Sequence, residues 1–156
     1  MFYISYFYMI RYFPENLVPV STAVWDHKWY HNFKDQNYIF FDNRHVLNGV
    51  RCQGLAPTQE HIPFIKPEDK CGGHEHCLYK PEDCNFLKNY EHYLHTLDFN
   101  DVCERIVSAV SQIVPNPNIC LMVHEKYDNV CSERVVLRKW FEENGSSLPE
   151  WKGIDK

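Results

Sequence analysis

The stretch that most constrains the fold of this chain is Asn118–His124, whose sequence is NICLMVH. It is short, continuous and apolar, and two prolines separate it from the preceding residues. A run of this kind is typical of a strand that is covered on both faces. Together with β-prone runs near the N-terminus and helical patterns on either side, it predicts a layered α/β domain.

Three stretches show apolar residues at helical spacing. The first, 82–97, follows a proline and begins with acidic residues, as helix starts prefer. The second begins near Asn100 and is stopped by two prolines. The third, Ser132–Asn144, ends at a glycine, which is a good helix stop. Its expected inward-facing residues are Val135, Val136, Trp140 and Phe141.

Runs of β-forming residues supply the rest of the predicted sheet. Phe2–Ile10 is expected to be the first strand, because it is too short to span a membrane and lacks the features of a secretory signal. Val18–Val24 is expected to be the second. Asn37–Phe41 and Val46–Cys52 could pair as a hairpin, although Asn48-Gly49 is a competing turn signal. We therefore predict a single three-layer α/β domain with a mixed sheet.

Length, charge and cysteine content narrow the class of protein. The chain has 156 residues, which suits one domain, and a net charge of −5, which argues against a strongly basic nucleic-acid coat. It has seven cysteines, an odd number that fits poorly with a complete disulfide framework. Since the sequence shows no export signal and no membrane segment, we expect a cytoplasmic protein with reduced thiols.

Residues 54–81 are predicted to form an irregular, proline-rich loop that leads into the Cys/His-rich segment CGGHEHCLYKPEDC. Thiolate and imidazole are ligands that zinc prefers in tetrahedral sites. The segment therefore predicts a zinc site, although its C-x5-C-x6-C spacing is not that of common zinc modules. Plain reduced cysteines and a redox switch are the alternatives, and Cys84 could instead face the core. The predicted ligands are Cys71, His74, Cys77 and Cys84, with His76 as the alternative to His74.

The residues between the last predicted strand and the last helix form the candidate site. In open α/β sheets, ligands bind beyond the carboxyl ends of the strands, which is where Glu125 lies. The N-terminus of the following helix favours anions and would lower the pKa of the Cys131 thiol. We therefore expect Ser132 and Arg134 to bind a ligand, with Glu125, Cys131 and Arg134 as the candidate catalytic residues.

Each of these residues also has a structural interpretation. Cys131 could pack beneath the helix as a buried thiol, and Ser132 could simply cap the helix. Arg134 could form an ion pair with Glu125 that holds the loop, instead of binding an anion. The chain lacks the phosphatase loop, because Leu137 stands where the arginine would be. It also has neither a Walker A motif nor a G-x-S-x-G motif.

The C-terminal stretch that starts with ICLMVHEK resembles the signature of the family called domain of unknown function 488. Glu125, Lys126 and Cys131 match its E-K pair and its cysteine, and Glu150-Trp151 matches its E-W more loosely. Where the family has Cys-His-Arg, this chain has Cys-Ser-Glu, with Arg134 one place later. The resemblance implies an α/β fold and a pocket near Glu125 and Cys131, but no established reaction.

The sequence supports two functional hypotheses. The first is the binding of a small anionic or nucleotide-like ligand at the strand-loop-helix around Glu125 and Cys131. The alternative is a non-catalytic, zinc-stabilised binding module for a protein or nucleic-acid partner. Aromatic residues between Trp25 and His31 could stack on bases, or pack on the sheet. The sequence does not distinguish an enzyme from a binding protein, and it does not indicate the oligomeric state.

Overall fold

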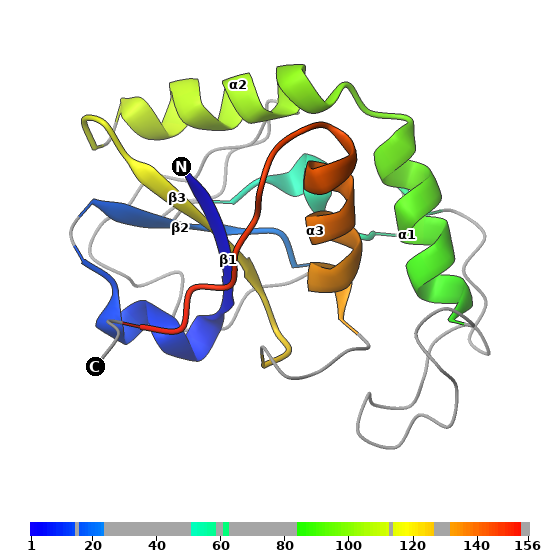
Figure 1. Cartoon of the computed structure of the whole chain (residues 1–156), viewed down its shortest axis with the longest axis horizontal. Helices are drawn as coiled ribbons and strands as arrows, with labels where there is room; N and C mark the ends of the chain where they lie inside the picture. The colour runs from blue at the N-terminus through cyan, green and yellow to red at the C-terminus, as the bar shows by residue number, and fades with distance from the viewer. Residues whose placement is uncertain are drawn as a thin grey trace.

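The central strand of the sheet is β3 (Asn118–Val123), as the apolar run predicts. The computed structural model describes residues 1–14, 16–23, 51–58, 61–62, 84–112, 114–126 and 132–153. β1 (Phe2–Tyr6) and β2 (Leu17–Ser21) flank β3 on either side, and both run parallel to it (Figure 1). The strand order is therefore β1-β3-β2, with the carboxyl ends of all three strands at one edge of the sheet.

The side chains of β3 alternate between two hydrophobic clusters, one on each face of the sheet. Ile119, Leu121 and Val123 belong to the first cluster, whereas Cys120 and Met122 belong to the second. All of them are at most 2% exposed. The strand is thus buried on both faces, which is the arrangement that its continuous apolar sequence predicts.

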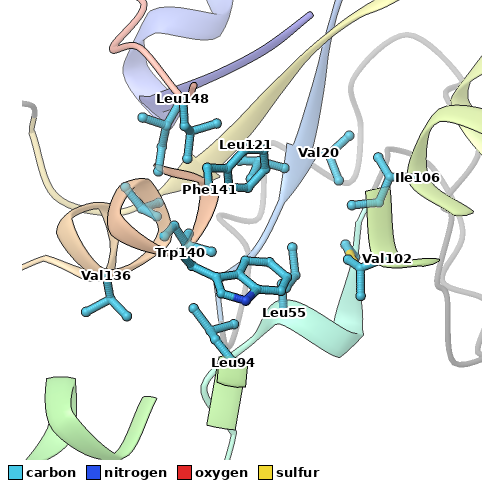
Figure 2. Packing of buried hydrophobic residues seen from close by; sticks show 14 of the residues in the cluster. Val20, Leu55, Leu94, Val102, Ile106, Leu121, Val136, Trp140, Phe141 and Leu148 are labelled. Carbon is cyan, nitrogen blue, oxygen red and sulfur yellow. The ribbon is translucent and has the colours of Figure 1, made fainter. Parts of the chain in front are cut away.

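The two faces of the sheet are covered by different elements. Helices α1 (Asn85–His95), α2 (Phe99–Ser111) and α3 (Glu133–Glu143) pack their apolar faces on the first cluster (Figure 2). The second cluster includes residues of a 3-10 helix, η1 (Phe7–Tyr12), and Trp151 from the C-terminal segment. The predicted α/β fold is therefore confirmed, with a covering layer on each face of the sheet.

The predicted first strand, Phe2–Ile10, is too long. The strand ends at Tyr6 and the chain continues as η1. Phe7 and Ile10 are buried three residues apart, whereas Tyr8 between them is 47% exposed. This spacing matches the three residues per turn of a 3-10 helix. These apolar residues are therefore buried in a 3-10 helix, although their β propensity favours a strand.

Helix α3 begins and ends where the sequence indicates. Ser132 caps its N-terminus, and Gly145 follows it with a φ of 76°, in the left-handed region that favours glycine. The predicted inward face is wrong at Val135, which is 38% exposed. At about 100° per residue, Val135 falls opposite the centre of the buried stripe. That stripe consists of Val136, Leu137, Trp140 and Phe141.

Two short backbone pairings extend the sheet at its edges. Glu150 pairs with Ile4 beside β1, and Arg51 pairs with Ser21 beside β2. Like the three strands themselves, both pairings are parallel, so the sheet is parallel throughout the described residues. The antiparallel hairpin predicted within 37–52, which would make the sheet mixed, lies outside the described residues apart from its last two positions.

Candidate functional site

Side chains from three segments meet at the carboxyl edge of the sheet. Glu125 lies two residues beyond the end of β3, and Ser132, Glu133 and Arg134 form the start of α3. Glu150 reaches the same place from the segment that follows α3. Because open α/β sheets bind their ligands at this edge, these residues form the candidate site, which we call the carboxyl-edge cluster.

Ser132 joins the end of β3 to the start of α3. Its hydroxyl donates to Oε1 of Glu125 at 2.7 Å and accepts from the backbone N–H of Arg134 at 3.2 Å. Ser132 is completely buried and is the N-cap residue of α3, so its capping role is confirmed. A serine hydroxyl has one hydrogen, and here Glu125 receives it. Ser132 therefore cannot donate to a ligand while it holds Glu125.

Arg134 is the largest fully buried side chain among the described residues, with 1% exposed. Its Nε and Nη2 donate to the two carboxylate oxygens of Glu150, at 2.8 and 3.4 Å. Its Nη1 donates to the backbone carbonyl oxygens of Glu125 and Lys126. The guanidinium thus uses four of its five N–H donors within the chain. The sequence suggested Glu125 as its ion-pair partner, but the paired carboxylate is that of Glu150.

Glu150 is a member of the cluster to which the sequence analysis gave no role. Its side chain is 9% exposed, and its Oε1 also accepts from Nη2 of Arg138 at 3.2 Å. Burial raises the pKa of Glu150, and the guanidiniums of Arg134 and Arg138 oppose this rise. Glu150 lies 16 positions from Arg134 in the sequence, so no local pattern links them. The only available signal was the Glu150-Trp151 match in the family resemblance.

Glu133 and Glu125 bring two carboxyl groups into contact. Burial raises the pKa of Glu133 well above its ordinary value of 4.5, and the charge and side-chain hydrogen bond of Glu125 raise it further. A hydrogen bond between two carboxyl groups needs a proton on one of them, and the raised pKa favours keeping that proton on Glu133. The sequence analysis assigned Glu133 no role, because an acidic residue in the first turn is common in helices.

Tyr90 of α1 lies close enough to Glu133 for the ionised form of Glu133 to affect the pKa of Tyr90. Burial is the main cause that raises the pKa of Tyr90, and the Glu133 carboxylate adds to it. The Tyr90 hydroxyl donates to the carbonyl of Leu55 at 2.5 Å, in the short 3-10 helix η3 (Gln53–Leu55). Tyr93 donates likewise to the carbonyl of Gly54. These bonds tie η3 to α1 beside the start of α3.

The N-terminus of α3 offers few unpaired N–H groups to an anion. The N–H of Arg134 is bonded to the Ser132 hydroxyl, and that of Val135 to the Ser132 carbonyl at 3.1 Å. The N–H of Glu133 is bonded to its own carboxyl group, which lowers the pKa of that group and opposes the larger effect of burial. An anion here would compete with these bonds and face the Glu125 carboxylate. The geometry therefore disfavours a bare anion at this helix end.

Of the predicted zinc ligands, Cys84 alone lies within the described residues. It directly precedes α1, is 8% exposed and packs in the first hydrophobic cluster. This position matches the alternative in which Cys84 faces the core. Within the described ranges, no group of three His, Cys, Asp or Glu residues is arranged to hold a metal ion. Most of the loop 54–81 lies outside them, together with Cys71, His74, His76 and Cys77.

We expect Cys84→Ala to leave the metal content of the protein unchanged and to destabilise it by about 1 kcal/mol, because it removes a buried sulfur atom from the core. Elemental analysis of untagged protein measures the metal content, and Cys71→Ala is the matched variant within the predicted zinc segment. If Cys84→Ala lost as much zinc as Cys71→Ala, Cys84 would be a metal ligand.

The four described cysteines, Cys52, Cys84, Cys103 and Cys120, are not joined in disulfide bonds. Burial raises the pKa of Cys103 to about 12 and that of Cys120 well above its ordinary value. Both thiols therefore stay protonated at neutral pH and are poor nucleophiles. Cys131, the predicted nucleophile, lies outside the described residues.

The helices of the described ranges are all too short or too polar to cross a membrane. Comparison with known proteins gave no match to a protein family, to a curated protein or to a solved structure.

Proposed function

We propose that this chain binds a small nucleotide-like ligand at the carboxyl edge of its sheet, and that Glu125 and Glu133 exchange a proton with it. The observation that carries the proposal is the contact between these two carboxyl groups, in which burial and Glu125 raise the pKa of Glu133. Both residues are intermediate between buried and exposed, so part of their surface faces solvent. The proposal keeps the predicted position, around Glu125 and Cys131, and makes Arg134 a support of the site.

The chemistry of the pair favours a nucleobase over a bare anion. When a ligand replaces the hydrogen bond between the two groups, a protonated carboxyl beside a carboxylate offers one hydrogen-bond donor and several acceptors. The edge of guanine carries complementary groups, the acceptor O6 beside two N–H donor positions. Inorganic phosphate carries negative charge, which the Glu125 carboxylate repels. A proton held between two carboxyls can also be given to a bound ligand or taken from it, as acid–base catalysis requires.

Calorimetric titration with guanosine monophosphate tests the proposal, with inorganic phosphate as the comparison ligand. We expect the nucleotide to bind and phosphate not to bind. Affinity falls as the pH rises through the pKa of Glu133, because losing the proton removes the donor and leaves two carboxylates. Glu133→Gln keeps a donor that does not titrate, so its affinity changes little with pH. Glu125→Gln binds at least about tenfold more weakly, since an acceptor is lost.

The matched control is Glu143→Gln, at the other end of α3. Glu143 pairs with His95 at 3.1 Å, and both side chains are largely exposed. This variant should bind the nucleotide like the wild type. Equal affinity for phosphate and nucleotide, or the same pH profile in the wild type and in Glu133→Gln, would contradict the proposal.

Membership of the domain of unknown function 488 is likewise a proposal. It is supported by the contacts of Glu125 and Glu150, two residues that carry the resemblance, with Arg134, which stands one place later than the family's arginine. In this chain a serine and a glutamate follow the motif cysteine, where the family has histidine and arginine.

A further inference from the structure

We infer that Glu150 is a positioning residue for the Glu125–Glu133 pair: acting through Arg134, it fixes the backbone that carries Glu125. The inference rests on the proposed function. It gives a role to the one member of the carboxyl-edge cluster that belongs neither to α3 nor to the residues that directly follow β3.

The backbone on either side of Glu150 is held on the edge of the sheet. The N–H of Ile4 donates to the carbonyl of Pro149 at 3.0 Å, and the N–H of Trp151 donates to the carbonyl of Ile4 at 2.8 Å. The hydroxyl of Ser5 donates to the carbonyl of Trp151 at 2.9 Å. The C-terminal segment therefore runs beside β1 (Figure 1), and β1 determines where the Glu150 side chain begins.

From that position, Glu150 orients Arg134. Its carboxylate accepts from Nε and Nη2 of the guanidinium, a two-point contact that fixes the plane of a rigid group. The remaining nitrogen, Nη1, is thereby directed at the carbonyl oxygens of Glu125 and Lys126. These two carbonyls define the path of the chain just beyond β3. Glu125 can then reach the Ser132 hydroxyl at 2.7 Å and meet Glu133.

Glu150 also balances the charge of Arg134. Within the described part of the chain, the titratable groups that face Glu133 are Glu125 at the end of β3, Arg134 on its own helix and Tyr90 on α1. The Arg134 guanidinium favours the ionised form of Glu133, and the Glu150 carboxylate offsets part of that positive charge. Removing the charge of Glu150 therefore lowers the pKa of Glu133. Loosening the backbone of Glu125 and Lys126 lowers it as well, because Glu125 is then no longer held against Glu133.

The test is a carbon-13 NMR titration of the side-chain carboxyl of Glu133 in the wild type, Glu150→Gln and Glu150→Asp. We expect the pKa of Glu133 to fall toward its ordinary value in Glu150→Gln, and to be intermediate in Glu150→Asp, which keeps the charge on a shorter side chain. If Glu150 only anchored the C-terminal segment, both variants would lose stability and the pKa of Glu133 would stay as in the wild type. Glu143→Gln is the matched control and should leave this pKa unchanged.

The outcomes separate this inference from the proposed function. If Glu133 of the wild type titrates at its ordinary value, the proposed function fails. If it titrates above that value and neither Glu150 variant changes it, the positioning role is overturned and the proposed function stands. Where Glu150→Gln does not fold, Glu150→Asp decides: a lowered pKa of Glu133 supports the inference, and an unchanged one overturns it.

Discussion

Arg134→Met is expected to destabilise the protein by about 3–5 kcal/mol, because it leaves the Glu150 carboxylate buried without its closest cation. Water cannot readily replace the guanidinium, since the Glu150 side chain is only 9% exposed. The carbonyls of Glu125 and Lys126 lose a donor in the same variant. Urea unfolding followed by tryptophan fluorescence measures the change in the free energy of unfolding.

A double variant shows whether the buried charge is the cause. Arg134→Met combined with Glu150→Leu removes both charges, so it should be more stable than Arg134→Met alone. Arg105→Met is the matched control: Arg105 pairs with Asp101 at 3.1 Å, with half of each side chain exposed. It should change stability by no more than about 0.5 kcal/mol. A double variant no more stable than the single one would rule out the buried Glu150 carboxylate as the cause.

The second large effect is expected for Trp140→Ala, which should destabilise the protein by about 3–5 kcal/mol. Trp140 is 3% exposed and lies in the first hydrophobic cluster (Figure 2). Its ring meets that of Phe99 of α2 edge-on, with centroids 5.0 Å apart, and that of Phe141 at 6.0 Å. The variant therefore leaves a large cavity between α3 and α2. Urea unfolding followed by circular dichroism measures the loss.

Val135→Ala is the control for this variant, because Val135 belongs to the same helix but is 38% exposed. It should alter the free energy of unfolding by no more than about 0.5 kcal/mol. Trp140→Phe keeps an aromatic ring in the cluster and should lie between the two. A similar decrease in the free energy of unfolding for Trp140→Ala and Val135→Ala would mean that the packing of Trp140 does not stabilise the contact of α3 with the core.

Features that depend on neighbouring residues could be predicted from the sequence. β3 follows from a continuous apolar run, and α3 follows from helical spacing, a serine at its start and a glycine after its end. These signals act over a few positions, because strand burial, helix periodicity and capping are short-range properties. The capping interpretation of Ser132 was accurate for the same reason.

Local sequence patterns gave a wrong prediction where the same residues are compatible with two backbone conformations. Phe7 and Ile10 are strong β formers, yet they belong to η1. Their spacing permits burial on the second face of the sheet in a 3-10 helix, and packing decides between the two conformations. The prediction for Val135 was wrong for a different reason. As an apolar side chain in an apolar stretch it was expected to be buried, but the buried face of α3 is the one that carries Trp140 and its neighbours.

The sequence by itself determined that an α/β domain forms, which strand is buried, and that Glu125 and the start of α3 lie at the carboxyl edge. Only the tertiary structure decided which side chains meet there: the Arg134 guanidinium pairs with the Glu150 carboxylate, and the carboxyl groups of Glu125 and Glu133 share a hydrogen bond. Charged side chains pair according to distance and burial, and both are set by the whole fold. Glu150 reaches Arg134 only because its backbone joins β1 at the opposite end of the sequence.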